Sequence, residues 1–180
     1  PASMIALRHL RTRTSEKSMA DEKNGGAAAT APEPGQMQVQ VLGQHIKDLS
    51  FENPNVGKLQ IKEGENPAVQ LEVNVDAQRL GPDVYESSIS FTATASHSGG
   101  NIYVLEIVYG GAFRLQNVPP QTLEPFLLVN CPTLLFPFLR RIVADVTREG
   151  GYPPLWLDPV DFGALYMRRQ QELAKTAEKQ

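Results

Sequence analysis

The order of two hydrophobic patterns constrains this chain more than any other feature of its sequence. Apolar and polar residues alternate in four stretches upstream of Pro119, and helical spacing replaces that alternation downstream of it. Alternation with a period of two is typical of strands that bury one face, whereas recurrence every three or four residues is typical of amphipathic helices. The four expected strands cover residues 37–51, 69–75, 85–95 and 102–108.

The segments between these stretches predict how the strands are connected. Gly43 interrupts the first stretch and predicts a bulge within one long strand. Short turns are expected at residues 81–83 and 98–101, so the second, third and fourth strands should be antiparallel neighbours. Residues 53–67 form a longer connection, which can cross an end or an edge of the sheet. The pair Gly110-Gly111 is expected to bend the fourth strand.

Two helices are expected after the strands. Apolar spacing over residues 135–146 predicts a main helix that ends at Gly150-Gly151 and either starts or kinks at Pro137. A second helix is expected over residues 159–174. Strands followed by helices predict an α+β fold: a four-stranded antiparallel sheet with a long main helix and a C-terminal helix packed on one face.

One folded domain is expected, at residues 37–175. Residues 1–36 are interpreted as a disordered leader, because a stretch rich in Ala, Gly, Pro and Thr buries too little apolar surface to offset its ordering entropy. Within it, residues 1–18 are interpreted as an extension that need not belong to the native protein, with an ordinary start at Met19; an organellar transit peptide is the alternative. Residues 176–180 are expected to be a frayed tail.

Charge is distributed unevenly along the sequence. The chain has 17 Lys and Arg against 20 Asp and Glu, which gives a net charge of −3. Residues 1–18 contain four basic residues and one acidic residue, which leaves 13 basic and 19 acidic residues in the remainder. An acidic body argues against nucleic-acid binding, which needs clustered Lys and Arg, and it favours basic partners or unfolded polypeptides.

Neither membrane insertion nor a disulfide is expected. We expect no apolar run to approach the ~20 residues that span a bilayer. The single cysteine, Cys131, excludes an intramolecular disulfide and a cysteine-rich metal site. A lone thiol is typical of a reducing compartment, so a cytoplasmic location is expected.

The residues that could support catalysis or metal binding do not form a recognisable set. His9, His45 and His97 share no helix face and no ligand spacing, so neither a metal nor a cofactor is predicted. Cys131 is followed by Pro132 and surrounded by apolar residues, so it is interpreted as a small buried hydrophobe. No glycine-rich phosphate loop is present. The chain is therefore not expected to be an enzyme.

Apolar residues exceed what two helices can cover on one face of a sheet. The stretch 69–75 carries four aliphatic residues, and the stretch 102–108 is apolar on both faces. Residues 134–138 are too uniformly apolar for a single buried stripe. The surplus is buried by the core itself, by self-association, by a ligand or by unfolded polypeptide, and periodicity leaves these four open.

Four motifs occur in order within residues 37–170. They are 46–54 (IKDLSFENP), 103–113 (YVLEIVYGGAF), 131–138 (CPTLLFPF) and 151–162 (GYPPLWLDPVDF). Their sequences and their order resemble the SecB family of bacterial export chaperones. Tyr152 and Trp156 depart from the residues usual in that family.

The resemblance implies a chaperone that holds unfolded preproteins without ATP. It also implies a homotetramer, built as a dimer of dimers, that delivers its clients to the translocation motor SecA. The implied site residues are Val69, Leu71, Val73, Phe136 and Phe138 for the client-binding groove, Asp48, Glu52 and Glu106 for SecA binding, and Leu105, Ile107 and Tyr109 for the oligomer interface.

Two other functions remain open at this point. A SecB-like chaperone that serves a toxin–antitoxin system would use the same groove, although retained SecA-facing carboxylates favour export. A ligand-binding α+β domain or a small enzyme that uses Cys131 or His45 belongs to a different class, and it predicts a reactive thiol of low pKa.

Overall fold

A computed structural model describes residues 35–55 and 67–177, which belong to one compact unit. Residues 1–34 of the expected leader lie outside the described residues, and so do residues 178–180 of the expected frayed tail. Residues 56–66 of the long connection also lie outside them.

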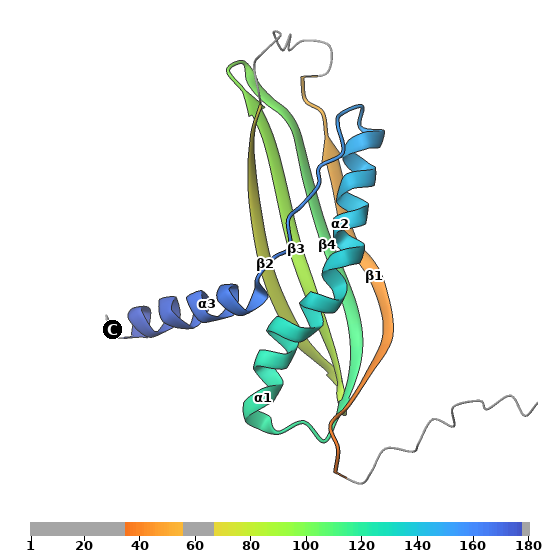
Figure 1. The fold of residues 1–180 in the computed structure, drawn as a ribbon, viewed down its shortest axis with the longest axis vertical. Coiled ribbons are helices and arrows are strands. Elements are labelled where there is room, and N and C mark those ends of the chain that lie inside the picture. Colours follow the sequence, from red (N-terminus) through yellow and green to blue (C-terminus); the bar gives the residue numbers. More distant parts are fainter. Residues whose placement is uncertain (1–34, 56–66, 178–180) are drawn as a thin grey trace, which may run out of the picture. The chain divides into compact units, whose positions relative to one another are not determined.

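The four expected strands form one antiparallel sheet, and the second, third and fourth are longer than their hydrophobic patterns indicated. They are β1 (Gln38–Glu52), β2 (Ala68–Gly81), β3 (Val84–His97) and β4 (Gly100–Gln116). The strand order is β1-β4-β3-β2, so the consecutive strands β1 and β2 form opposite edges of the sheet (Figure 1). The connection between them includes residues 56–66, so its expected course lies outside the described residues.

The expected bulge in β1 is present, and a second one follows it. Pairing with β4 shifts between Val41 and Gly43, and again between Ile46 and Asp48. At each shift β1 has one residue more than β4. Beyond the shift, paired residues of the two strands again point to the same face of the sheet. After the second shift, Asp48 pairs with Val108 on the face opposite the helices.

β4 continues through Gly110-Gly111 to Gln116, and the expected bend at the two glycines stays a prediction. Gly111 provides space beneath the main helix. A Cβ atom at Gly111 would lie 2.7 Å from Cδ2 of Leu135 on the main helix. The absence of a side chain at Gly111 therefore lets the main helix approach the sheet closely.

The helical region is one long run followed by a separate helix. It comprises α1 (Pro120–Pro125), the π-helical segment η1 (Phe126–Asn130), α2 (Cys131–Glu149) and, after an extended linker, α3 (Phe162–Ala177). Pro137 lies inside α2, on its exposed side, so the main helix does not start there. Ser87 on β3 donates a buried hydrogen bond of 2.8 Å to the carbonyl oxygen of Leu127, which ties η1 to the sheet.

The core lies between α2 and the face of the sheet that α2 covers. Its fully buried large side chains include Ile89, Leu105, Ile107 and Phe113 from the sheet and Leu135, Leu139 and Val143 from α2. The α+β fold class, with a four-stranded antiparallel sheet, a long helix and a C-terminal helix, is confirmed. The helix α3 packs chiefly through its first two turns, and every side chain from Gln171 to Thr176 is exposed.

One expectation about membrane spans needs correction. Within the described residues, the run Pro120–Glu149 is 30 residues long and apolar enough, by length and composition, to cross a bilayer. In the structure this run supplies the buried residues Leu135, Leu139 and Val143 to the core against the sheet. Core helices of soluble proteins pass the same test, so the run is weak evidence for a membrane span.

Candidate functional site

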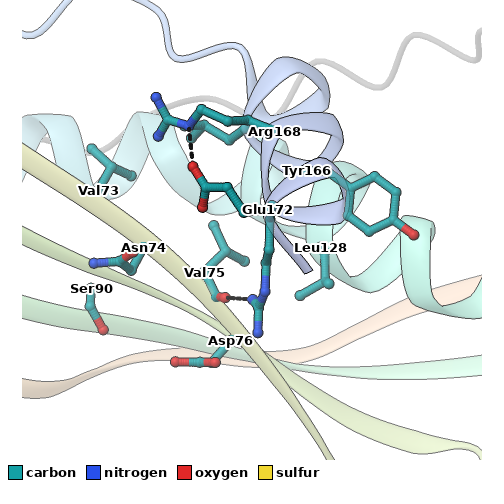
Figure 2. A pocket seen from close by; sticks show the side chains of 11 residues that line it. Val73, Asn74, Val75, Asp76, Ser90, Leu128, Tyr166, Arg168 and Glu172 are labelled. Carbon is teal, nitrogen blue, oxygen red and sulfur yellow. Dashed lines mark hydrogen bonds and ion pairs between the residues drawn. The ribbon is translucent and has the colours of Figure 1, made fainter. Parts of the chain in front are cut away.

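A groove follows the free edge of β2. Its middle section is a cavity of about 490 Å³ lined by β2 residues 73–76, by Leu128 of η1 and by the first turns of α3 (Figure 2). Cavities of about 400 and 350 Å³ continue it along β2 in the two directions, lined by residues 71–74 and 76–77. We call this surface, along residues 71–77, the β2-edge groove.

The lining of the groove shows that it opens onto the edge of the strand. Successive side chains of a strand point to opposite faces of a sheet, yet four consecutive residues, 73–76, line one cavity. A cavity can touch four consecutive strand residues only if it lies beside the strand. Among the described residues, β2 pairs with β3 alone, so this side of β2 has no partner strand.

One hydrogen bond identifies which backbone groups face the groove. Arg169 of α3 donates from Nη1 to the carbonyl oxygen of Val75, at 3.0 Å. In antiparallel strands the N–H and C=O of one residue point to the same side, and the side alternates along the chain. Leu71, Val73 and Ala77 therefore direct their backbone groups to the groove together with Val75.

The predicted β2 residues lie on one face, but only two of them line the groove. Leu71 and Val73 line it, and Leu71 is 48% exposed. Val69 lies two residues further along the same face and is 42% exposed. The alternation in the sequence therefore predicted correctly which side chains of β2 share a face, while their role in client binding stays a prediction.

The structure does not bring Phe136 and Phe138 together with those residues. Residues two apart on a helix point to nearly opposite sides, because each residue advances the helix by about 100°. Phe136 is buried and packs edge-on against Phe162, with ring centroids 5.8 Å apart. Phe138 is 50% exposed on the side of α2 that faces away from the sheet. Neither side chain lines the β2-edge groove, and their role in client binding stays a prediction.

The three predicted SecA-facing carboxylates do lie together, on the face of the sheet opposite the helices. In the pairing of β1 with β4, Glu106 is opposite Ser50, which lies between Asp48 and Glu52 on the same face of β1. Such diagonal neighbours are about 7–8 Å apart. All three side chains are exposed, and within the described residues none has an ion-pair partner.

A further carboxylate extends this row across the sheet. Glu106 pairs with Thr92 on β3, and Thr92 pairs with Glu72 on β2. The row Ser50, Glu106, Thr92 and Glu72 therefore crosses all four strands on one face. The sequence alone did not distinguish Glu72 from other surface acids, because its position depends on the order of the strands.

Glu86 shows how a structural carboxylate on the same face differs from these. It is buried, and its carboxylate accepts hydrogen bonds from Lys47 Nζ at 2.6 Å and from Gln78 Nε2 at 2.5 Å. His45 Nε2 lies 3.3 Å from its other oxygen. The hydrogen bond from Lys47 lowers the pKa of Glu86 below its ordinary value, although burial opposes this shift. Glu86 is thus satisfied within the chain.

The residues predicted for the oligomer interface are core residues of the single chain. Leu105 and Ile107 are 0% and 1% exposed, and Tyr109 is 7% exposed, because alternate residues of β4 face the helix-covered side. The hydroxyl of Tyr109 donates to Oε1 of Gln44 at 3.2 Å. These side chains are buried within the single chain, and their role at an oligomer interface stays a prediction.

The sequence analysis missed an exposed apolar row on the other edge of the sheet. The row lies on the helix-covered side of the sheet. It consists of Met37, just before β1, and four β1 residues, each 40–45% exposed: Val39, Val41, Ile46 and Leu49. Alternation indicated a common face for Met37, Val39 and Val41, whereas Ile46 and Leu49 join that face through the two register shifts in β1. It did not indicate that β1 is an edge strand whose face α2 leaves partly uncovered.

The residues considered for catalysis remain apart. Cys131 is fully buried, and desolvation raises the pKa of its thiol to about 12, so the nucleophilic thiolate is disfavoured. His45 is half-exposed beside Glu86, on the face of the sheet away from the helices. Across the part of the chain that the structure describes, no group of three or more His, Cys, Asp or Glu residues is placed to hold a metal ion.

Comparison with known proteins identifies relatives over most of the chain. The family model described as preprotein translocase subunit SecB matches residues 32–173. Protein-export protein SecB of Afipia carboxidovorans is 44% identical over 162 residues, covering 90% of this chain and 96% of the relative. Protein-export protein SecB of a Bradyrhizobium species is 45% identical over 151 residues, covering 84% and 91%.

A solved structure shares the fold at much lower identity. It is a SecB-like chaperone of Mycobacterium tuberculosis in complex with a peptide from an antitoxin. Its TM-score is 0.57 at 15% identity, with 68% of this chain and 90% of that chain covered. The family match and the sequence identities carry the assignment, while this likeness concerns the fold alone. The chain belongs to the SecB family of protein-export chaperones.

Proposed function

We propose that this protein is an ATP-independent holdase that binds unfolded preproteins in the β2-edge groove and keeps them competent for translocation. The observation that carries the proposal is the combination of exposed aliphatic side chains with a strand edge that has no partner strand among the described residues. The groove spans seven residues of β2, which at about 3.3 Å per residue gives roughly 23 Å for an extended segment.

The chemistry of this edge explains how one groove can accept many clients. An extended segment that adds to β2 exchanges main-chain hydrogen bonds, which every sequence offers. Leu71 and Val73 add apolar contact without demanding one particular side chain. A long client that visits grooves on several subunits gains further affinity through effective concentration. Release needs no nucleotide if a competing partner takes over the client.

We further propose that the face carrying Asp48, Glu52 and Glu106 binds SecA. Three exposed carboxylates that form no ion pair with any described residue favour a basic partner and steer it electrostatically. The proposed site of action is the cytoplasm, and the proposed activity is binding and transfer rather than enzymatic turnover.

The exposed apolar row on β1 supports the homotetramer that the family resemblance implies. An edge strand that has no second partner strand among the described residues, with a row of apolar side chains exposed by 40–45%, is prone to pair with a second copy. We expect the protein to have the mass of a tetramer in light scattering coupled to size-exclusion chromatography. A monomeric mass at micromolar concentration contradicts this assembly.

The holdase proposal is tested by diluting a chemically unfolded secretory precursor into nucleotide-free buffer and following its refolding and light scattering. We expect the protein to delay refolding and to suppress aggregation at a near-stoichiometric ratio. Leu71→Asp places a carboxylate in the groove, which costs burial of an aliphatic side chain and desolvation of a charge. It should weaken client binding by about tenfold or more.

Leu80→Asp is the matched control for that variant. Leu80 lies on the same strand and is 54% exposed, but it is outside the β2-edge groove. The control should suppress aggregation like the unmodified protein. If Leu71→Asp and Leu80→Asp hold the precursor equally well, the groove is not the client site, and if the unmodified protein has no effect on the precursor, the holdase proposal fails.

A chaperone for a toxin–antitoxin system is the second candidate. The solved relative bound to an antitoxin peptide favours it, because the two chains share their fold. The relatives of 44–45% identity are export proteins by name, and they favour preproteins as clients. Transfer of a bound precursor to SecA separates the two candidates, since only the export chaperone is expected to show it.

A further inference from the structure

The β2-edge groove already contains one side chain that is bonded to the strand edge. Arg169 reaches from α3 across the groove, and its guanidinium donates to the carbonyl oxygen of Val75 at 3.0 Å. Figure 2 marks this hydrogen bond at Val75, in the middle of the cavity that Val73, Asn74 and Asp76 also line. The guanidinium is therefore placed where the backbone of an added strand has to lie.

An added strand and Arg169 compete for the same acceptor. An extended segment that pairs with β2 must donate its own N–H to the carbonyl oxygen of Val75, because this residue directs its backbone groups to the free edge. Partner strands lie about 4.8 Å apart, which leaves no room for a guanidinium between them. Strand addition at Val75 thus requires Arg169 to move away.

From this geometry we propose that Arg169 blocks strand addition at Val75 in the empty protein and is displaced by an extended client segment. The inference rests on the proposed function and adds a specificity-determining residue to it. Arg169 is exposed, so it can leave Val75 for solvent without disturbing the core. A segment that forms several backbone hydrogen bonds displaces it, whereas a single passing contact does not. The same bond protects an otherwise open edge from unproductive pairing.

Arg168 provides a matched control for the charge. It precedes Arg169 on α3 and lines the same cavity. Its Nε lies 4.0 Å from Oε1 of Glu172, and it has no hydrogen bond to the edge of β2. Removing Arg168 therefore takes the same positive charge from the groove and leaves the carbonyl oxygen of Val75 occupied.

The test compares variants with two synthetic peptides. The first is an uncharged, apolar nine-residue peptide, and the second is the same peptide with N-methyl groups on every residue, which removes the backbone hydrogen-bond donors along both edges. For the first peptide, Arg169→Ala should lower Kd about threefold to tenfold, the range that corresponds to freeing one hydrogen-bond acceptor. Arg168→Ala should leave Kd unchanged. For the methylated peptide, Arg169→Ala should give no gain.

Arg169→Gln serves as a second variant, which retains a polar helical residue but is too short to keep the same contact. It should tighten binding of the unmethylated peptide in the same direction. Unchanged or weaker binding by both Arg169 variants overturns the inference, and so does an equal gain for the methylated peptide or for Arg168→Ala. Failure of the proposed function is distinguishable, because the unmodified protein then neither binds these peptides nor suppresses aggregation.

Discussion

Replacing Asp48, Glu52 and Glu106 with lysine is expected to abolish binding of SecA while leaving suppression of client aggregation intact. The three carboxylates occupy neighbouring positions on one exposed face, so the variant changes the local charge by six units and turns attraction into repulsion. We expect the affinity to fall by about 100-fold or more, since each close charge contact at an interface contributes on the order of 1–2 kcal/mol. Isothermal titration calorimetry with purified SecA measures the loss.

The control variant makes an equal change in net charge on a different surface of the chain. Lysine at Glu124, Glu149 and Asp158 reverses three exposed carboxylates on the helical side of the chain. This control should bind SecA with an affinity close to that of the unmodified protein. Binding by the unmodified protein should also weaken as ionic strength rises, because exposed charges are screened. If the Asp48, Glu52 and Glu106 variant still binds SecA, the proposed docking face is wrong.

The faces of the strands were predictable because alternation is a local property. In β2, spacing alone placed Val69, Leu71 and Val73 on one side, and the register with β3 confirms it. Which edge of the sheet stays open depends on the strand order β1-β4-β3-β2, which is set by contacts between distant residues. The β2-edge groove and the apolar row on β1 were therefore beyond the reach of periodicity.

Which face of β4 the helices cover was out of reach for the same reason. Both faces of this strand carry apolar residues, and the pattern does not say which face the helices cover. The structure places Leu105 under the helices and Glu106 on the open face. Successive side chains of a strand point to opposite faces of the sheet. If the helices covered the other face, the buried and the exposed side chains would change places along the whole strand.

The main helix illustrates a different limit. Pro137 predicted a start or a kink, because proline removes one helical hydrogen bond. The structure keeps Pro137 within α2, on its exposed side, while Leu135 and Leu139 on the other side are fully buried. Tertiary packing of the apolar stripe outweighs the local preference. How closely this helix approaches the sheet could not be read from the sequence, and Gly111 decides it.

Gly111→Val is expected to be the most destabilising single substitution considered for this chain. A Cβ atom at this position would lie 2.7 Å from Leu135 Cδ2 and 3.0 Å from Cε2 of the Phe113 ring, and both residues are fully buried. Valine adds two further methyl groups to a space that is already too small, so we expect a loss of about 3 kcal/mol in the free energy of unfolding. Urea denaturation at a fixed protein concentration measures it, since assembly makes stability depend on concentration.

Gly110→Ala is the control, because the neighbouring glycine faces the other side of the sheet. A Cβ atom there meets Lys47 Cδ at 3.1 Å, in a flexible side chain that can shift, so the stability should stay within about 1 kcal/mol of the unmodified protein. Combining Gly111→Val with Leu135→Ala tests the cause directly. If the clash with Leu135 is responsible, the double variant loses less stability than the sum of the two single losses, by about 1 kcal/mol or more. Additive losses would show that Gly111 is required for a reason other than the approach of α2.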